Sequence, residues 1–234
     1  MRCGLLGEKL GHSYSPALHA LFGDYDYELF EVSPDRLGDF LRVRDFQGLN
    51  VTIPYKTTML AICDDLTETA ATIGSVNTVL KQLDGSLLGD NTDAAGFEGM
   101  VWKSRIRILG RKCLVLGSGG ASLSAQYVLR KLGAGEVVVI SRTGENNYDN
   151  LDRHQDAAVI VNATPVGMYP NTAASPVDLR QFPHCEGVLD LIYNPARTAL
   201  LQQAETLGIP HLGGLYMLAE QARCAAQLFT GEVI

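Results

Sequence analysis

Short apolar segments, polar turns and brief helical patterns alternate over the first hundred residues. Apolar positions of the strand type predict strands at residues 3–7, 27–32 and 48–54. Apolar side chains at helical spacing predict one helix with Ser15 as its N-cap and another around Met59. This half of the chain therefore mixes strands and helices.

A two-residue hairpin is predicted at Asp84 and Gly85, because this dipeptide stands between two apolar segments. With that turn, Asn77 lies opposite Thr92 and next to Asp93. The hairpin therefore brings Asn77 and Asp93 to one end of the sheet.

From about residue 110 the pattern changes to apolar strand, glycine-rich turn, helix and apolar strand, which is typical of a βαβ unit. The predicted strands are residues 112–116, 136–140, 157–161 and 187–192. The predicted helices are residues 121–132, 195–207 and 215–229. The strand at residues 136–140 is apolar on both faces, as expected of a parallel sheet covered on both sides.

We therefore predict an α/β protein with two lobes. The first is a substrate-binding α/β lobe of residues 1–99, on which the C-terminal helix of residues 214–234 packs back. The second is a Rossmann-like, doubly wound nucleotide-binding lobe of residues 100–213. We expect the active site in a cleft between the lobes, whose closure would exclude water.

Composition and charge exclude several classes of protein. The 234 residues carry a net charge of -7, with 46% hydrophobic and 19% charged residues, which excludes general disorder and disfavours nucleic-acid or membrane-surface partners. No apolar segment approaches the roughly 20 residues of a membrane span, and charge comes too early for a signal peptide. The five cysteines form no CxxC pair and the five histidines lack ligand spacing, which favours a cytoplasmic protein with reduced thiols and no metal site.

A glycine-rich turn follows the strand predicted at residues 112–116 and opens a helix. Its residues are Gly117, Ser118, Gly119, Gly120 and Ala121, followed by Ser122. In dinucleotide-binding turns the first glycine permits the tight turn, and the second lets the backbone approach a pyrophosphate at the helix N-terminus. Ser122 stands where a third glycine is usual. An ordinary glycine-rich turn is the alternative, but the βαβ context favours a cofactor.

The end of the next predicted strand indicates which nucleotide binds. An NAD site usually has Asp or Glu about 20 residues after the glycines, whereas this chain has Ser141, Arg142 and Thr143. A guanidinium can hold the 2′-phosphate of NADP, which a carboxylate would repel. The position therefore indicates NADP, with a solvated arginine as the alternative.

Hydroxyls and a lysine are candidate ligand contacts in the first lobe. Ser13 and Ser15 at a helix start suit a carboxylate, with helix capping as the alternative for Ser15. Lys56 at the end of a strand is a candidate proton donor, with Asp93 as the carboxylate that holds its ammonium. A surface lysine and an N-capping aspartate are the alternatives for this pair.

Polar residues also follow the later strands. The turn of residues 162–168 lies after a buried strand, where doubly wound sheets bind ligands, and Tyr193 follows the next strand in the same way. Gln221 lies near the apolar face of the last helix, so it is either an internal hydrogen-bonding residue or a ligand contact.

Together these residues resemble the shikimate dehydrogenase family. The matching segments follow the family order over nearly the whole chain. They are residues 11–16 with His19 (HSxSPxxH), 50–56 (NVTxPxK), 74–78 (GAVNT), 89–97 (GxNTDxxGF), the glycine-rich turn, 141–143 (NRT), 162–165 (NATP), 193–195 (YNP) and 214–221 (GxxMLxxQ).

The resemblance implies NADP-dependent interconversion of 3-dehydroshikimate and shikimate in aromatic amino-acid biosynthesis. It implies that Lys56, paired with Asp93, is the catalytic acid and base. The substrate carboxylate would be held by Ser13, Ser15 and Tyr193, and the ring hydroxyls by Asn50, Thr52, Asn77, Asp93 and Gln221. The cofactor would be lined by Gly117, Ser118, Gly119, Gly120, Ala121, Ser141, Arg142, Thr143, Thr164, Leu191 and Gly214, with Glu68 near the nicotinamide end.

Departures from the family pattern concern the cofactor lobe. Thr143 is only 19 positions before Asn162, so we expect a helix or a strand–helix unit to be missing there. Ser141 replaces the asparagine of NRT. The carboxylate of Glu145, which follows shortly after, would repel a 2′-phosphate bound near this segment. Binding of NAD therefore stays possible beside NADP.

Other functions stay open on the sequence. An NAD-dependent quinate or quinate/shikimate dehydrogenase is the nearest alternative, since quinate differs by a ring hydroxyl. A non-catalytic ligand-binding module of the same fold and an oxidoreductase of another small hydroxylated acid are further alternatives. Retention of Lys56 and Asp93 argues against the non-catalytic module. We expect a monomer or homodimer whose partner is a small-molecule substrate.

Overall fold

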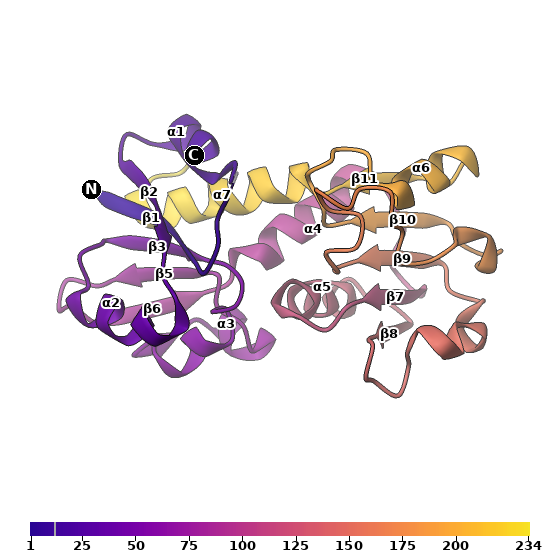
Figure 1. Cartoon of the computed structure of the whole chain (residues 1–234), viewed down its shortest axis with the longest axis horizontal. Helices are drawn as coiled ribbons and strands as arrows, with labels where there is room; N and C mark the ends of the chain where they lie inside the picture. The colour runs from indigo at the N-terminus through magenta and orange to yellow at the C-terminus, as the bar shows by residue number, and fades with distance from the viewer. Residues whose placement is uncertain (12) are drawn as a thin grey trace. The chain divides into compact units, whose positions relative to one another are not determined.

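The computed structural model describes residues 1–11 and 13–234, and Figure 1 shows the chain. The chain divides into two compact units. Unit 1 comprises Met1–Ala95 and Ala219–Ile234, and unit 2 comprises Gly96–Leu218. The boundaries fall within α4 (Thr92–Ser104) and α7 (Leu215–Thr230). Both units combine strands with helices, which confirms the predicted α/β class.

Unit 1 is built on a mixed sheet. Within residues 1–11 and 13–95, its strands lie in the spatial order β2 (Asp26–Glu31), β1 (Arg2–Gly7), β3 (Gly48–Val51), β5 (Thr78–Lys81), β6 (Leu87–Asp90) and β4 (Asp65–Leu66). β1 is parallel to both of its neighbours, whereas β5 pairs antiparallel with β3 and β6. Every residue of β3 is buried, including the polar Asn50, which therefore needs hydrogen-bond partners inside the unit.

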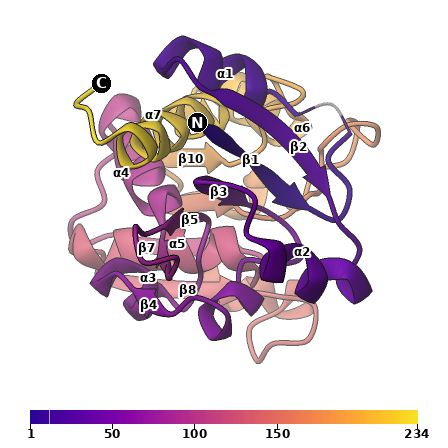
Figure 2. The same ribbon diagram turned by 90° about the vertical axis from the view of Figure 1, so that its left-hand side faces the viewer.

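Helices cover both faces of this sheet (Figure 2). On one face, α2 (Leu37–Val43), which follows the 3₁₀ helix η1 (Pro34–Arg36), packs in a core that includes Leu41, Phe46 and Leu49. The 3₁₀ helix η2 (Thr58–Ala61) and α3 (Glu68–Ile73) contribute Met59 and Ala70 to the same core. On the other face, Phe229 of α7 packs against Cys3, and His19 of α1 (Ser15–Phe22) stacks on Tyr27.

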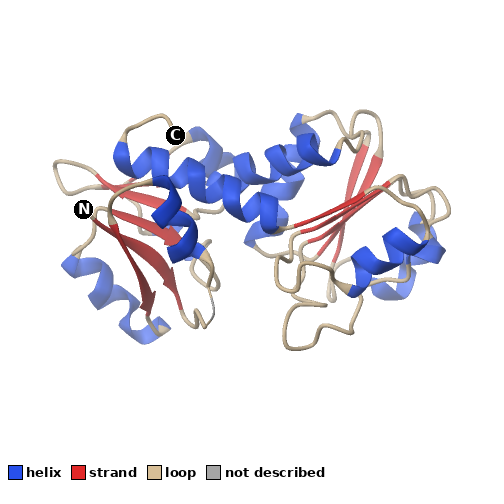
Figure 3. Cartoon of the chain, turned by 90° about the horizontal axis from the view of Figure 1, so that it is seen from above, coloured by secondary structure: helices blue, strands red, loops and turns tan. Residues whose placement is uncertain are grey.

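Unit 2 is a parallel sheet of the doubly wound type. Its strands lie in the order β11 (His211–Gly213), β10 (Gly187–Asp190), β9 (Val159–Asn162), β7 (Lys112–Leu116) and β8 (Glu136–Ile140), and every pairing is parallel. α5 (Gly120–Lys131) contacts β7 and β8, while α6 (Ala199–Thr206) contacts β10 and β11. Helices lie on both sides of the sheet (Figure 3), as the Rossmann-like prediction requires.

The crossover from β8 to β9 is short. The sheet order corresponds to strands 2, 1, 4, 5 and 6 of the six-stranded order 3-2-1-4-5-6. A turn and the 3₁₀ helix η3 (Tyr148–His154) replace strand 3 and its helices. This is the strand–helix unit whose loss the spacing predicts.

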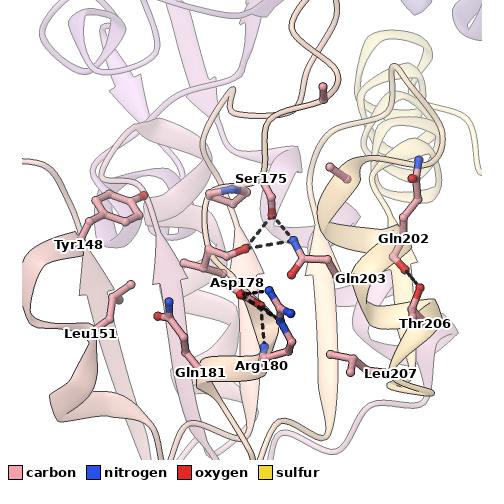
Figure 4. A pocket seen from close by; sticks show the side chains of 14 residues that line it. Tyr148, Leu151, Ser175, Asp178, Arg180, Gln181, Gln202, Gln203, Thr206 and Leu207 are labelled. Carbon is pink, nitrogen blue, oxygen red and sulfur yellow. Dashed lines mark hydrogen bonds and ion pairs between the residues drawn. The ribbon is translucent and has the colours of Figure 1, made fainter.

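A cavity of about 790 Å³ lies in unit 2 beside this crossover (Figure 4). Tyr148 and Leu151 of η3 line one side, and residues of α6 line the other. Gln203 Nε2 donates to Ser175 Oγ at 2.8 Å, and Leu179 N, in the 3₁₀ helix η4 (Leu179–Gln181), donates to Gln203 Oε1 at 3.0 Å. The shortened crossover thus forms one wall of the cavity, and the polar groups of Gln203 are used within the opposite wall.

Two predictions about helices near the start of the chain are wrong. α1 begins at Ser15 with Tyr14 as its N-cap, so Ser15 does not cap it. Ser13 Oγ accepts a hydrogen bond from Ser15 N at 3.2 Å, which draws Ser15 into the first helical position. The segment around Met59 is the 3₁₀ helix η2 and not an α-helix.

The hairpin between β5 and β6 also differs from its prediction. The loop is closed by a hydrogen bond from Gln82 N to Ser86 O at 2.8 Å, so it is longer than two residues. Asp84 Oδ1 accepts from Ser86 N, and Gly85 adopts a φ of 87°, which stabilises the wider loop. The register consequently pairs Thr78 with Asp90, and Asn77 does not lie directly opposite Thr92.

Candidate active site

A lysine and an aspartate from distant parts of unit 1 form a buried ion pair. Lys56 lies in the turn after β3, and Asp93 lies in the first turn of α4. Lys56 Nζ donates to Asp93 Oδ2 at 2.5 Å, and the side chains are 15% and 8% exposed. Because the pair is shielded from water, removing one partner would leave a buried charge.

Asn77 holds the second oxygen of Asp93. Its Nδ2 donates to Asp93 Oδ1 at 2.9 Å. Asn91 Oδ1 accepts from Ala94 N, three residues later, so Asn91 and not Asp93 acts as the N-cap of α4. The Asp93 carboxylate is therefore available to the ammonium and the amide, at the helix end that favours negative charge.

A buried polar network extends from Asn77 to β2. Thr92 N donates to Asn77 Oδ1 at 2.7 Å, and Thr78 Oγ1 donates to the same oxygen at 3.0 Å. Asn50 Nδ2, in β3, donates to Thr78 Oγ1 at 3.3 Å, and Tyr27 Oη donates to Asn50 Oδ1 at 2.8 Å. The structure thus brings both candidate ring-binding amides, Asn50 and Asn77, into one network with the ion pair.

The two candidate serines lie at the start of α1. Ser15 is buried, and Ser13 is half-buried. Burial holds the pKa of the Tyr27 hydroxyl well above its ordinary value, and a hydrogen bond with the Ser15 side chain acts in the opposite direction. Ser15 is thereby a neighbour of the polar network. His12, from the same motif, lies outside the described residues.

Four other candidate residues come from different elements of the two units. Thr52 is half-buried directly after β3, and its N–H donates to Leu6 O at 2.9 Å. Gln221 is buried on α7, and Glu68 is exposed in the first turn of α3. Tyr193, the third candidate for the carboxylate, is half-buried in unit 2, after β10.

The glycine-rich turn in unit 2 fits a nucleotide pyrophosphate. Gly117 adopts a φ of +104°, and a Cβ there would lie 3.0 Å from Ala163 O. Gly119 is the N-cap of α5, no side chain caps that helix end, and a Cβ at Gly119 would meet open space. Ser122 is buried and donates to Gly117 O at 2.6 Å, which closes the turn where the family pattern has a third glycine. The uncapped amides of α5 are oriented for an anion.

The segment after β8 forms a closed turn that carries the candidate arginine. Ser141 N donates to Asn146 O at 3.1 Å, and Asn147 forms a capping box with Asn150 at the start of η3. Arg142 and Thr143 are exposed on this turn. Among the described residues, no hydrogen bond or ion pair involves the Arg142 guanidinium. Glu145 is exposed on the same turn.

The carboxyl ends of β9 and β10 are joined by a buried carboxylate. Asn162 Oδ1 accepts from Thr164 Oγ1 at 2.7 Å, and Asn162 Nδ2 donates to Asp190 Oδ1 at 3.0 Å. Asp190 Oδ2 accepts from Thr198 Oγ1 at 2.6 Å. Burial raises the pKa of the Asp190 carboxyl to about 6, against the effect of these hydrogen bonds. The candidate Thr164 is thus held in place by Asn162.

Close backbone packing surrounds the last two cofactor candidates. A Cβ at Gly214 would lie 2.1 Å from Leu191 O, so only glycine fits there without displacement of the backbone. Gly214 N donates to Ile192 O at 3.0 Å. Leu191 is half-buried directly after β10. Both residues therefore lie at the same sheet edge as Thr164.

Residues 1–11 and 13–234 hold no group of three or more His, Cys, Asp or Glu side chains that could bind a metal ion. Within the same residues, no helix has the length and apolar character needed to cross a membrane.

Sequence reasoning missed Tyr27 and Thr78, whose hydroxyls bond to the candidate amides. Thr78 directly follows Asn77, but a strand-forming threonine after an asparagine is a common pattern. Tyr27 lies in a predicted strand far from the other motifs. Only the pairing of β1 with β2 and β3 brings Tyr27 to Asn50.

Comparison with known proteins gives matches along the chain. A family model described as the shikimate dehydrogenase substrate binding domain matches residues 5–79. A curated relative, shikimate dehydrogenase (NADP(+)) of Clostridium perfringens strain SM101, is 35% identical, with 97% of this chain and 92% of the relative covered. That alignment extends over 249 residues, more than the 234 of this chain, so the relative contains residues that this chain lacks.

Solved structures agree in fold. Shikimate dehydrogenase 1 from Peptoclostridium difficile superposes with a TM-score of 0.91 at 34% identity, covering 99% of this chain and 92% of that one. Shikimate 5-dehydrogenase from Thermus thermophilus, solved in complex with NADP(H) and shikimate, has a TM-score of 0.89 at 36% identity, covering 99% and 94%.

Proposed function

The chain belongs to the shikimate dehydrogenase family, and we propose that it reduces 3-dehydroshikimate to shikimate reversibly with NADPH. The activity is an NADP-dependent oxidation or reduction at a CH–OH group, as the names of the relatives indicate. The buried contact between Lys56 and Asp93, completed by Asn77, carries the assignment of residue roles.

Lys56 is the proposed acid and base. When bound, the nicotinamide supplies the hydride, and negative charge develops on the ketone oxygen. The Lys56 ammonium has three N–H groups, and one of them is given to Asp93. The others stabilise the developing alkoxide and deliver a proton to it, and in the oxidation direction the Lys56 amine takes that proton back. Asp93 keeps the ammonium in place.

Binding of the substrate divides between hydroxyls and amides. We assign the single carboxylate to Ser13, Ser15 and Tyr193, because hydroxyls donate to a carboxylate without bringing a charge. We assign the ring hydroxyls to the polar side chains of unit 1 that lie in or beside the network. These are Asn50, Thr52, Asn77, Asp93 and Gln221.

Unit 2 has the features that an NADP site requires. The uncapped N-terminus of α5 suits the pyrophosphate, and the exposed guanidinium of Arg142 suits the 2′-phosphate. Ser118, Gly120, Ala121, Ser141, Thr143, Thr164, Leu191 and Gly214 complete the proposed lining in this unit, and Glu68 is the proposed contact from unit 1.

An assay with four substrate pairs tests the proposed function. Purified protein is mixed with NADP or NAD and with shikimate or quinate, and the absorbance of the reduced nicotinamide is followed. We expect the highest kcat/KM with shikimate and NADP. Turnover of quinate with NAD alone would assign a quinate dehydrogenase, and absence of turnover with every pair would assign a ligand-binding module. We expect the protein to be cytoplasmic and to be a monomer or a homodimer. Light scattering of the purified protein distinguishes the two oligomeric states.

A further inference from the structure

Every hydrogen bond along one line of side chains in unit 1 can be assigned a direction. The line starts at Tyr27, passes through Asn50, Thr78 and Asn77, and ends at Asp93. Its four bonds measure 2.8, 3.3, 3.0 and 2.9 Å in that order. Asn50, Thr78 and Asn77 are buried, so water does not compete for these groups.

The charge of Asp93 fixes the order at one end. A carboxylate that binds an ammonium has no proton to donate, so Asn77 must present its Nδ2 to Asp93 Oδ1. Asn77 Oδ1 then faces Thr92 N at 2.7 Å and the Thr78 hydroxyl. Asn77 Oδ1 only accepts, so the Thr78 hydroxyl donates to it, and the Thr92 hydroxyl, 3.0 Å from Thr78 Oγ1 and 3.2 Å from Asn77 Oδ1, belongs to the same cluster. The Thr78 oxygen accepts from Asn50 Nδ2.

Tyr27 fixes the order at the other end. Its phenol donates to Asn50 Oδ1, so the Asn50 amide presents Nδ2 to Thr78. Burial keeps the phenol protonated, since it raises the pKa of Tyr27 well above the ordinary value. All four donors consequently point toward the Asp93 carboxylate, and bonds aligned in this way strengthen one another.

We propose that Thr78 is a positioning residue of the substrate site, whose hydroxyl holds Asn50 and Asn77 in the amide orientations that receive the ring hydroxyls of shikimate. The inference rests on the proposed function, in which both asparagines bind the substrate. Thr78 contacts both amides through one oxygen, which accepts from Asn50 and donates to Asn77. Tyr27 holds the far side of Asn50.

Loss of the Thr78 hydroxyl would act on substrate binding in particular. Thr78→Val keeps the shape of the buried side chain but leaves Asn50 Nδ2 and Asn77 Oδ1 each without one partner. Asn50 then keeps its bond to Tyr27, and Asn77 keeps its bonds to Thr92 N and Asp93. The link that holds the two amides relative to each other is lost, and with it the fixed array that meets the ring hydroxyls. The residues proposed for the nucleotide belong almost entirely to unit 2, so the affinity for NADP should stay unchanged in Thr78→Val.

The test compares Thr78→Val with Thr78→Ser, which retains the hydroxyl. We expect Thr78→Val to raise the KM and the calorimetric Kd for shikimate by about tenfold or more, with the KM for NADP unchanged. Thr78→Ser should restore most of the affinity. Thr230→Val is the matched control, because within residues 1–11 and 13–234 the Thr230 hydroxyl bonds only to Ala226 O and Glu232 N, at the end of α7.

Several outcomes would overturn the inference. These are unchanged shikimate affinity in Thr78→Val, an equal loss of affinity for NADP, or a defect in Thr78→Ser as large as in Thr78→Val. If Thr78→Val does not fold, Tyr27→Phe replaces it, with a smaller rise in the same KM expected and no change overturning the inference. Failure of the proposed function is separate, because the wild-type protein itself would then neither bind nor turn over shikimate.

Discussion

Lys56 Nζ lies 2.5 Å from Asp93 Oδ2, on the carboxylate whose other oxygen is occupied by Asn77. Both oxygens of Asp93 are therefore engaged, and the carboxylate cannot rotate without breaking a bond to an amide or an ammonium. This arrangement leaves Lys56 with one fixed N–H and two that can face a substrate oxygen.

Lys56→Ala tests the acid–base role. We expect kcat for shikimate oxidation to fall by about 100- to 10,000-fold, because general acid–base catalysis contributes about that much. The KM for shikimate should change far less. Steady-state kinetics measures both, with Lys131→Ala as a control that removes a surface lysine paired with Glu98. A large rise in the KM for shikimate with kcat preserved would reassign Lys56 to substrate binding.

Arg142→Ala tests recognition of the 2′-phosphate. Loss of a charge-assisted hydrogen bond should raise the KM for NADP by about 10- to 100-fold, while the KM for NAD stays the same. Glu145→Gln should act in the opposite direction, since it removes a negative charge from the same turn. Arg130→Ala, on the exposed side of α5, is the control. Equal weakening of both nucleotides by Arg142→Ala would contradict this role.

His19 should make unit 1 sensitive to acid. Burial lowers the pKa of His19 in the folded protein to about 4, whereas the unfolded value is about 6.5. Between these values the unfolded chain binds a proton that the folded protein does not. The contribution of His19 to the free energy of unfolding should therefore fall as pH decreases from about 6.5 to about 4, by on the order of 3 kcal/mol.

Urea unfolding across that pH range measures the effect. His19→Phe should flatten the dependence, although it also removes the partner of the Tyr25 hydroxyl at every pH. His184→Phe, at an exposed position, should leave the dependence unchanged. The same pH dependence in wild type and His19→Phe would rule out His19 as the cause.

Asp190 should have the opposite effect in unit 2. Its folded pKa is raised to about 6 by burial, above an unfolded value of about 3.9. The Asp190 carboxyl of the folded protein then holds a proton that the unfolded chain has lost, so the contribution of Asp190 to the free energy of unfolding falls as pH rises between these values and opposes that of His19. Asp190→Asn should remove this slope and should be at least as stable as the wild-type protein above pH 6. The new side-chain amide can accept from Asn162 through its oxygen and donate to the Thr198 hydroxyl oxygen through its nitrogen. Marked destabilisation of Asp190→Asn at neutral pH, measured by urea unfolding, would contradict the prediction.

Much of unit 2 was predictable because its signals are local. The strand at Glu136–Ile140 follows from a continuous apolar pattern, and the glycine-rich turn follows from spacing. The helix at Leu215–Thr230, most of which belongs to unit 1, follows from apolar side chains at helical spacing. The short elements α2, α3, β4 and β11 were not predicted, because two to seven residues carry too little periodicity to distinguish them from turns. The predicted register of the hairpin was wrong by one residue, because the Asp84 side chain accepts hydrogen bonds from Ser86 and stabilises a loop that is longer than predicted.

The sequence by itself determined the residue types of the site, the family and the two kinds of ligand, because motif spacing is a property of the chain. Tertiary structure decided which oxygen faces which donor. The pairing of β1, β3 and β5 brings Tyr27, Asn50 and Thr78 into contact, and the capping of α4 by Asn91 leaves Asp93 to the ammonium. Most of these hydrogen bonds join residues that are 15 to 37 positions apart in the chain, so only the fold can set their direction.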